Sequence, residues 1–213
     1  MNELDQEFLF REAKKVGVVL KPIQLQMFVT FLKELKAWNK RVNLTSLQED
    51  LDILIKHFID SLLPMRFIPL HSYLLDIGSG AGFPGIPLKI AEPSLLVTLL
   101  DSKLKKVFFQ RHIIRKLGLQ GIEAMHGRAE HAKKRDEVPL FDVVVSRAIY
   151  TLEELQQVSE GYLKKKGTLI VLKTPKEAME EKQVKASFRL KECLDCELPL
   201  KKGKRRIILL QKA

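Results

Sequence analysis

Between residues 73 and 174, short apolar runs alternate with stretches of helical periodicity, and this alternation limits the possible fold more than any other feature. The runs read YLLDIG, LLVTLLD, GIEAMHG, FDVVVSRA and GTLIVLKT. They lack a strict apolar–polar alternation, which is typical of strands buried on both faces in a parallel sheet covered by helices. Two further strand-like segments, FRLKECLDCELPL and RRIILLQKA, flank the turn KKGKR. The chain is therefore predicted to form an α/β fold on a seven-stranded sheet.

The first 70 residues show the spacing of amphipathic helices instead. Apolar residues share one face of a first helix over residues 4–16 and one face of a second over residues 27–38. Ser46 and Glu49 match a capping box, which predicts a third helix that ends near Pro64. We therefore divide the chain into an N-terminal helical extension, residues 1–70, and a core, residues 71–213, on which the extension packs.

A glycine-rich segment, LLDIGSGAGFPGIPL, follows directly on the first apolar run. In a doubly wound sheet, ligands bind at the carboxyl ends of the strands, where this segment is expected to lie. Gly78, Gly80 and Gly82 remove the Cβ atoms that would block a ligand there. The segment is also expected to lead into a helix whose first N–H groups are unpaired. We therefore expect this loop to bind a nucleoside cofactor. The plain alternative is that the glycines only form a tight turn.

Two classes of cofactor use this architecture. The letters GAGFPG satisfy GxGxxG, the dinucleotide fingerprint, so an NAD-dependent oxidoreductase is one alternative. Asp76 argues against it, because a carboxylate at the strand end repels a pyrophosphate and suits a cationic ligand such as S-adenosylmethionine. Pro84 and Pro87 also remove N–H donors at the start of the helix. Asp101, which ends the second strand, would accept hydrogen bonds from the ribose hydroxyls of either cofactor.

Two later strand ends supply further candidates. HGRAEHA follows the third strand, where methyltransferases of this architecture place their adenine contacts, so Ala129 and Glu130 are expected to border an adenine. Arg147 follows the fourth strand, where its side chain would meet the substrate over the cofactor. The plain alternatives are a solvated helix start for Glu130 and a surface ion pair for Arg147.

Six motifs together resemble one family. WNKRVNLTS, HFIDSL, LLDIGSGAGFPGIPL, DSKLKKVFF, GRAE and VVVSRA occur in the order and rough spacing of the bacterial 16S ribosomal RNA guanine-N7 methyltransferases, the glucose-inhibited division protein B family. The likeness runs from about residue 20 to the end of the chain. The glycine loop is common to many methyltransferases, whereas NLTS followed by HFIDSL and GSGAGFPGIPL is far more restrictive.

The resemblance implies a class I, Rossmann-like, S-adenosylmethionine-dependent methyltransferase with a mostly parallel seven-stranded sheet and an antiparallel last strand. It implies that Gly78 and Phe83 contact S-adenosylmethionine, that Asp101 holds the ribose, and that Ala129 and Glu130 border the adenine. Arg147 would line the pocket on the side of methyl transfer. The chain departs from the family pattern at VLKTP, where a glycine is expected after Lys173.

Transfer to guanine N7 needs little acid–base chemistry. N7 carries an in-plane lone pair and no proton, so no general base is expected and catalysis rests on positioning. The product is a cationic purine, so we assign Arg147 to orientation and not to charge stabilisation. His57, Asp60 and Ser61 share one helix face and invite comparison with a serine hydrolase. Neither an oxyanion hole nor a strained nucleophile turn is visible, and we favour a polar network near the pocket.

The charge of the chain favours a polyanionic partner. Lysine and arginine total 37 against 26 acidic residues, a formal net charge of +11, which points to nucleic acid first and an acidic membrane second. The partner implied by the resemblance is 16S rRNA or the small ribosomal subunit. Candidate phosphate contacts are Lys40, Arg41, the cluster Lys133, Lys134 and Arg135, and Lys165, Lys166, Lys201, Lys202, Lys204, Arg205 and Arg206.

Several properties are expected to be absent. No apolar run is long enough to span a bilayer, the N-terminus lacks the pattern of a signal peptide, and we expect a cytoplasmic monomer. Cys193 and Cys196 form one CxxC without partners for a zinc site, so we expect no metal. The functional alternatives are the same cofactor with another RNA or a protein as acceptor, an NAD-dependent oxidoreductase, and a binding protein with a degenerate site.

Overall fold

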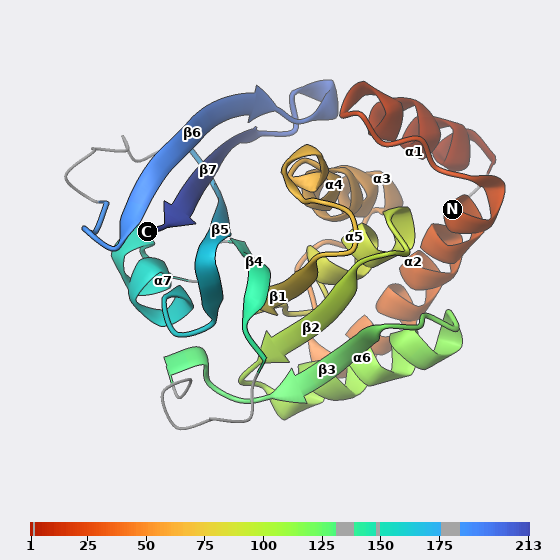
Figure 1. The fold of residues 1–213 in the computed structure, drawn as a ribbon. Coiled ribbons are helices and arrows are strands. Elements are labelled where there is room, and N and C mark those ends of the chain that lie inside the picture. The colour runs from red at the N-terminus through yellow and green to blue at the C-terminus, as the bar shows by residue number, and fades with distance from the viewer. Residues whose placement is uncertain (2, 131–138, 148–149, 176–183) are drawn as a thin grey trace.

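The computed structural model describes residues 1, 3–130, 139–147, 150–175 and 184–213. Its strands are β1 (Tyr73–Ile77), β2 (Leu96–Asp101), β3 (Ile122–His126), β4 (Phe141–Arg147), β5 (Leu163–Lys173), β6 (Phe188–Glu197) and β7 (Lys204–Lys212). They form one sheet of seven strands in the order β3-β2-β1-β4-β5-β7-β6 (Figure 1). β1 to β5 pair in parallel, and β7 runs antiparallel between β5 and β6. The predicted mostly parallel sheet with an antiparallel last strand is confirmed.

Consecutive residues of the central strands lie in two different hydrophobic cores. Leu74 of β1 packs in one core and Leu75 in the other, and Val143 and Val144 of β4 divide in the same way. Side chains alternate between the faces of a strand, so both faces must be covered to bury such a run. This explains why the apolar runs of the sequence show no polar alternation.

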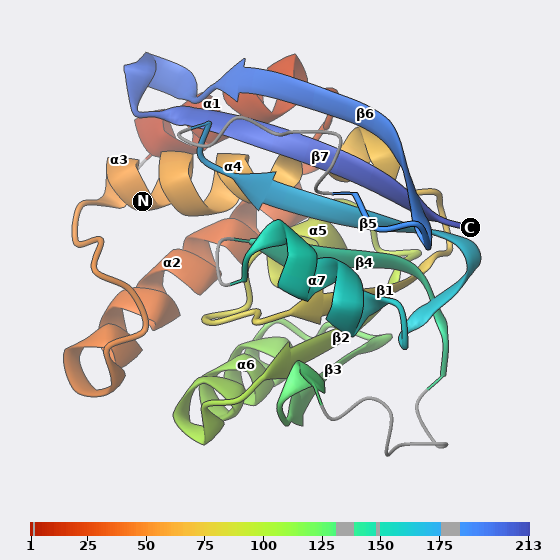
Figure 2. The same cartoon turned by 90° about the vertical axis from the view of Figure 1, so that its left-hand side faces the viewer.

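Helices cover both faces of the sheet (Figures 1 and 2). The helical segments are α1 (Glu3–Lys15), α2 (Pro22–Val42), α3 (Asp50–Ile53), the π-helix η1 (Leu54–Ile59), α4 (Asp60–Leu62), the 3₁₀ helix η2 (Met65–Phe67), α5 (Gly85–Ala91), α6 (Leu104–Lys116), α7 (Leu152–Ser159) and the 3₁₀ helix η5 (Pro199–Lys201). Residues of α1, α2, η1, α5 and α6 fill the larger core on one face, and α7 belongs to the core on the other. The helices of the first 70 residues thus share a core with the sheet, and the division at residue 70 stays a prediction.

The predicted third helix exists, but it begins later than the capping box indicated. α3 begins at Asp50, so Glu49 and not Ser46 occupies the N-cap position. No side chain makes a capping hydrogen bond at this end. The proposed capping by Ser46 is therefore wrong. The middle of the helix is η1, a six-residue π-helical segment that the sequence pattern did not reveal. π-helical turns are rare and often occur at functional sites.

α2 and α6 pack side by side in opposite directions. Glu34 of α2 accepts from the ring of His112 at 2.7 Å, and one turn later Trp38 packs against both His112 and Phe109. The C-terminal end of α2 therefore lies beside the N-terminal end of α6. Both ends lie at the edge of the sheet where the parallel strands finish, which is called the carboxyl edge below. In the described part of the chain, no helix has both the length and the apolar character needed to cross a membrane.

Candidate functional site

The glycine loop after β1 lies at the carboxyl edge. Gly78, Gly80 and Gly82 have positive φ angles, a conformation that residues with a side chain rarely adopt. The N–H of Gly78 donates to the carbonyl oxygen of Leu100 at 2.8 Å, so the loop is fixed to the end of β2. A Cβ on Gly82 would lie 2.3 Å from Ile86, whereas a Cβ on Gly80 would meet nothing closer than 3.8 Å. Gly82 is required for packing, and a side chain at Gly80 would meet the Nζ of Lys106 and the carbonyl oxygen of Gly78 at ordinary contact distances.

Asp101, at the end of β2, joins the glycine loop to α6. One carboxylate oxygen accepts from the N–H of Gly80 and the other from the N–H of Lys103, each at 2.8 Å. Gln110 of α6 completes the frame, because its amide donates to Ser79 Oγ at 2.9 Å and to the carbonyl oxygen of Gly80 at 2.7 Å. The sequence analysis identified Asp101 but not Gln110. The only sign of a role for Gln110 in the sequence is that it is a polar residue among the apolar residues of a helix.

Asp76 lies beneath the loop and not at its surface. The residue is 0% exposed, and its Oδ2 accepts from the N–H of Gly85 at 2.8 Å. Its Oδ1 has no hydrogen-bond partner within the described residues. Burial raises the pKa of Asp76 to about 7, an effect that the Gly85 hydrogen bond and the charge of Arg147 oppose. A buried carboxyl with an unpaired oxygen and a raised pKa gains most from a nearby cation.

The start of α5 contradicts one expectation. The N–H of Gly85 is taken by Asp76, and the N–H of Ile86 donates to the carbonyl oxygen of Gly82 at 2.8 Å. Pro87 has no N–H to offer. The expected unpaired N–H groups at this helix start are therefore wrong, because the acid beneath the loop and the loop itself occupy them. A pyrophosphate would find no donor there.

Phe83 connects the glycine loop to a second group of polar residues. Its ring is 4% exposed and stacks on the rings of His57, at 4.5 Å, and Phe31, at 5.2 Å. The guanidinium of Arg147 lies 5.3 Å from the centre of the same ring. The Phe83 side chain thus supports His57 and Arg147, so its predicted contact with a cofactor would be made by the main chain.

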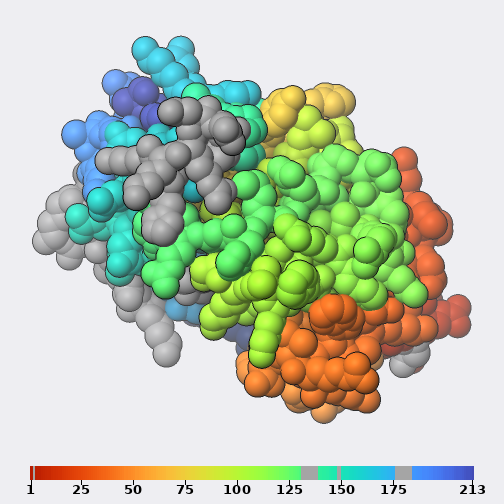
Figure 3. Space-filling model, turned by 90° about the horizontal axis from the view of Figure 1, so that it is seen from below, coloured from red at the N-terminus to blue at the C-terminus, as the bar shows by residue number. Residues whose placement is uncertain are grey.

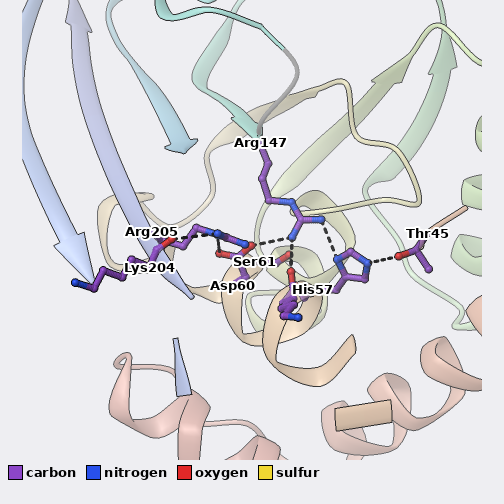
Figure 4. Close-up of polar contacts among 8 residues, drawn as sticks. Thr45, His57, Asp60, Ser61, Arg147, Lys204 and Arg205 are labelled. Carbon is purple, nitrogen blue, oxygen red and sulfur yellow. Dashed lines mark hydrogen bonds and ion pairs between the residues drawn. The ribbon is translucent and has the colours of Figure 1, made fainter. Parts of the chain in front are cut away.

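Arg147, at the end of β4, donates into the π-helix η1 (Figure 4). Its Nη1 donates to the carbonyl oxygen of Lys56 and to Asp60 Oδ2, each at 3.0 Å. Its Nη2 lies 3.1 Å from His57 Nδ1. The side chain is only 16% exposed, so the alternative of a surface ion pair does not describe it. Three hydrogen bonds fix the plane of the guanidinium relative to η1 and the start of α4.

Asp60 is shared by two arginines (Figure 4). Its Oδ1 accepts from Nε of Arg205, at the start of β7, at 2.7 Å, while Oδ2 pairs with Arg147. Asp60 is 0% exposed, and a buried carboxylate is stable only when it is paired. One negative charge therefore links the end of β4 to the start of β7, and Asp60 together with the two guanidinium groups has a net positive charge.

His57 is a neutral acceptor in this network. Burial and then the charge of Arg147 lower its pKa to about 3. Because an arginine only donates, Nδ1 must be the acceptor, and the proton lies on Nε2. That nitrogen lies 2.7 Å from Thr45 Oγ1, which accepts from it. Thr45, from the segment NLTS, therefore fixes the tautomer that receives Arg147.

The trio His57, Asp60 and Ser61 does not form a catalytic triad. The Ser61 hydroxyl donates to the main-chain carbonyl oxygen of His57, at 2.5 Å, and not to its ring. Asp60 bonds the two arginines, and both ring nitrogens of His57 face other partners. The structure shows the polar network that the sequence favoured over a hydrolase.

Two of the hollows in the described part of the chain border residues expected to contact the cofactor or the substrate. The first, of about 260 Å³, adjoins the Arg147 network and is lined by Thr45, Ser46, Leu47, Lys56, His57, Arg147, Leu172, Lys173, Thr174 and Arg205. Lys173 thus lies close to Arg147, although the sequence left its role open. The second, of about 290 Å³, is lined by Ala129, Glu130, Tyr150, Glu154, Gln157, Val158 and Gly161. Ala129 and Glu130 face this hollow together, as an adenine contact would require.

Tyr150 closes one side of the second hollow. Its hydroxyl donates to Glu130 at 3.0 Å, and burial together with this bond raises the pKa of Tyr150 to about 12. Tyr162 donates to the carbonyl oxygen of Ala129 at 3.2 Å. Neither tyrosine was singled out from the sequence, where both look like ordinary core residues.

The basic residues of the β6–β7 hairpin lie at the carboxyl edge, but most of their charge is paired. Lys202 lies 3.0 Å from Asp52, Arg205 bonds Asp60, and Arg206 makes two bonds to Asp195, at 2.6 and 2.7 Å. Lys201 is exposed in η5, and Lys204 opens β7 opposite Glu197. The hairpin is therefore less available to phosphates than its composition indicated.

The other basic candidates are spread over the molecule. Lys40 and Arg41 are exposed at the C-terminal end of α2, at the carboxyl edge. Lys165 and Lys166 lie near the start of β5, at the opposite edge, where the carbonyl oxygen of Lys166 accepts from Gln211 near the end of β7. The structure thus separates these lysines from the glycine loop. The cluster at residues 133–135 lies outside the described residues.

No group of three His, Cys, Asp or Glu side chains in the described ranges is arranged to hold a metal ion. Cys193 and Cys196 are free thiols on β6, one exposed and one half-buried. Burial is the main cause of the raised pKa of each thiol.

Two kinds of sequence comparison point to one family. A family model described as rRNA small subunit methyltransferase G matches residues 24–209. Ribosomal RNA small subunit methyltransferase G of Geotalea uraniireducens (strain Rf4) is 37% identical, over 100% of this chain and 99% of the relative. The protein of that name from Staphylococcus epidermidis (strain ATCC 35984) is 36% identical, over 97% of this chain and 89% of the relative.

Solved structures share the fold. A mutant of MtNAS in complex with S-adenosylmethionine superposes with a TM-score of 0.60 at 14% identity, covering 98% of this chain and 77% of that chain. TrmN from Thermus thermophilus superposes with a TM-score of 0.59 at 18% identity, covering 75% of this chain and 53% of that chain. At these identities the likeness concerns the fold alone.

Proposed function

The chain belongs to the rRNA small subunit methyltransferase G family, and from this membership we propose that it transfers a methyl group from S-adenosylmethionine to N7 of a guanine in 16S rRNA. The family that the motifs indicated is confirmed. The base and its ring position come from the resemblance of the motifs alone. The place of action, the cytoplasm, and the monomeric state belong to the proposal as well.

One observation supports this function above the others: Phe83 lies between the loop for the donor and the groups for the acceptor. It follows Gly82 in the chain, and its ring contacts both His57 and Arg147. A methyltransferase must bring donor and acceptor into line within a few ångströms. The two halves of the site are joined here by a buried aromatic ring and not by a flexible segment.

S-adenosylmethionine fits the residues of the loop. Gly78 and Gly80 carry no side chain and have positive φ angles, so a cofactor can approach the main chain of the loop, and the unpaired Oδ1 of buried Asp76 favours a cation over a phosphate. When bound, this cofactor supplies an electrophilic methyl group on a sulfonium centre. The proposed contacts are Gly78, Gly80, Gly82 and the main chain of Phe83 at the loop, Asp101 at the ribose, Ala129 and Glu130 at the adenine, and Arg147 on the acceptor side. Asp76, which is buried beneath the loop, acts on the cofactor electrostatically and not by direct contact.

The residues of the acceptor side orient and do not transfer protons. His57 has a pKa of about 3 and is neutral at physiological pH, and both of its ring nitrogens already face partners. Guanine N7 has no proton to lose, so a site without a free base is sufficient. Arg147, fixed by Asp60 and His57, presents a rigid guanidinium whose role is to orient the RNA.

The dinucleotide alternative has lost its main support. GxGxxG binds a pyrophosphate through free N–H groups at a helix start. In this chain Asp76 and Gly82 occupy those of Gly85 and Ile86. An NAD-dependent oxidoreductase is therefore not proposed.

Two measurements test the function. N7-methylguanine is mapped in 16S rRNA from cells with and without the protein, and one such mark should be missing only in the deletion strain. Calorimetry should show binding of S-adenosylmethionine and of its demethylated product, but not of NAD. Asp101→Ala should weaken this binding. An unchanged set of marks in the deletion strain, or methyl transfer to a protein instead, would overturn the proposal.

A further inference from the structure

α6 presents an aromatic ring to solvent that none of the roles above uses. Phe108 is 50% exposed, and Leu104, one turn earlier on the same side, is 44% exposed. The neighbouring Phe109 is fully buried against Phe31 and Trp38. Figure 3 shows α6 beside the C-terminal part of α2 on an open face of the molecule. A single exposed apolar residue is common, so the surroundings of Phe108 decide its meaning.

Those surroundings are strongly basic. The segment KLKKVFFQRHIIRK, residues 103–116, contains no acidic residue. Lys105 is exposed beside Leu104, and Lys40 and Arg41 are exposed at the adjoining end of α2. Within the described part of the chain, none of these three cations has an ion pair. Lys40 lies about 200° around α2 from Trp38 and therefore on the side away from α6, whereas Arg41 lies nearer to it. The term α2–α6 face is used below for Arg41, Leu104, Lys105 and Phe108.

The α2–α6 face adjoins the glycine loop. α6 begins three residues after Asp101, and the Nζ of Lys106 lies 3.8 Å from the position of a Cβ on Gly80. Phe108 lies about 6 Å further along the helix axis than Leu104, at 1.5 Å per residue. A polymer that reaches the glycine loop from the side of α6 must cross the face.

We propose that the α2–α6 face binds a single-stranded segment of the rRNA substrate, with an unpaired base stacked on Phe108 and phosphates held by Lys105 and Arg41. The inference rests on the proposed function, since it names where that substrate lies. Proteins bind unpaired RNA through aromatic side chains that stack on bases and cations that follow the backbone. Stacking needs a ring with a free face, which Phe108 offers.

An anionic membrane fits this face less well. A helix that lies in a membrane interface turns its whole apolar side to the lipid. The apolar side of α6 is already used in the core through Val107, Phe109 and Ile113. Two exposed apolar residues remain, and cations from two different helices surround them.

The ring is tested by RNA affinity. Wild type, Phe108→Ala, Phe108→Leu and Phe108→Trp are titrated with a labelled 20-nucleotide single-stranded RNA and with deproteinised 16S rRNA. Base–aromatic stacking corresponds to about a 5- to 150-fold change in affinity, so the Ala and Leu variants should bind at least about 5-fold more weakly. Phe108→Trp should bind like wild type. Phe10→Ala, at a 37% exposed phenylalanine of α1, is the matched control and should change nothing.

The cations are tested by salt dependence. Each phosphate contact to single-stranded nucleic acid contributes about 0.7 to the slope of log affinity against log salt. Lys105→Ala should lower that slope by about 0.7. Lys165→Ala, at the opposite edge of the sheet, should leave it unchanged. Affinity for S-adenosylmethionine, measured by calorimetry, should stay within twofold of wild type in all variants.

The outcomes separate this inference from the proposed function. If wild type methylates 16S rRNA but Phe108→Ala and Lys105→Ala bind RNA normally, the inference is overturned and the function stands. If wild type methylates no rRNA, yet the variants lose RNA affinity with Phe108→Trp intact, the face binds RNA and the function falls. Loss of binding only to vesicles of anionic phospholipid, with RNA binding unchanged, would overturn the inference in favour of a membrane.

Discussion

The Arg147 network and the α2–α6 face each hold two cations at the same edge of the sheet, but the cations of the network share a buried carboxylate and those of the face do not. In the network, the buried Asp60 pairs with both Arg147 and Arg205. On the face, Arg41 and Lys105 are exposed and have no ion pair with any described residue. A paired, buried cation has fixed geometry, whereas an exposed cation without a partner keeps its charge available to a ligand.

The difference assigns separate tasks to the two regions. The network can orient one group precisely, because Arg147 donates each of its hydrogen bonds to an acceptor that is itself held in place. The α2–α6 face can attract and hold a polyanion, but it cannot specify a single base. Substitutions in the network should therefore affect stability and turnover, and substitutions on the face should affect RNA affinity and its salt dependence.

The largest effect is expected from Asp60→Asn. This change leaves the guanidinium groups of Arg147 and Arg205 facing each other without a negative charge between them. Loss of one partner of a buried pair costs about 3–5 kcal/mol. Urea unfolding should show a loss of this size, together with loss of methylation.

Asp195→Asn is the matched control, because Asp195 also pairs with an arginine of β7, Arg206, but is 51% exposed. Its effect on stability should be small, since an exposed ion pair contributes little. Equal effects of the two changes would contradict the distinction between the buried network and the hairpin surface.

The next effect concerns the dependence of stability on pH. Burial raises the pKa of Asp76 to about 7, so its contribution to stability is complete below its unfolded pKa near 4 and is lost as pH rises toward 7. Burial and Arg147 lower the pKa of His57 to about 3, so its contribution is complete above pH 6.5 and is lost as pH falls. Between pH 4 and 6.5 the two contributions oppose each other, each by up to about 1.4 kcal/mol per pH unit.

Single variants should expose these opposing slopes. Asp76→Asn leaves only the His57 contribution, so the free energy of unfolding should fall as pH is lowered from 6.5 to 4. His57→Gln leaves only the Asp76 contribution, so it should fall as pH is raised over the same range. Urea titrations at three pH values measure both, and the double variant should be flat again. Parallel pH profiles for the two single variants would show that these groups do not titrate as their burial predicts.

Thr45→Val should have an intermediate effect, mainly on turnover. Without the hydroxyl, Nε2–H of His57 loses its acceptor, and the alternative tautomer would turn an N–H toward the donors of Arg147. Loss of a buried hydrogen bond of this kind costs about 1–2 kcal/mol, or about a tenfold fall in kcat. Thr45→Ser should retain activity, and affinity for S-adenosylmethionine should not change. Nitrogen-15 shifts of His57 report the tautomer directly.

Much of the fold could be predicted because it depends on patterns spread over many residues. Runs without polar alternation required a sheet covered on both faces, and both cores were found. The strand ends also placed Asp101 and Arg147 correctly at the carboxyl edge. These features follow from local periodicity and from the rule that parallel strands end together.

The partners of the site residues could not be predicted, because they come from segments far apart in the chain. Nothing near Arg205 indicates that Asp60, 145 residues earlier, neutralises it. The π-helical turn that presents the carbonyl oxygen of Lys56 has no sequence signature. Phe108 and Phe109 are adjacent and equally apolar, so only packing against Phe31 and Trp38 decides which one is buried.

The smallest effect is expected from Asp52→Asn, which would give the Arg147 network unpaired cations like those of the α2–α6 face. Asp52 lies 3.2 Å from Lys56 Nζ and 3.0 Å from Lys202 Nζ, so Asp52→Asn removes the neutralising charge of two cations near the Arg147 network. If Lys56 and Lys202 fail to bind RNA only because Asp52 pairs with them, the affinity for RNA should rise about twofold to fivefold in this variant. The slope of log affinity against log salt should steepen by about 0.7 for each cation that gains a phosphate contact. Filter binding of deproteinised 16S rRNA at several salt concentrations measures both. Lys202→Gln alone should leave affinity unchanged, and a loss of affinity in this variant would show that Lys202 already contacts RNA despite its ion pair.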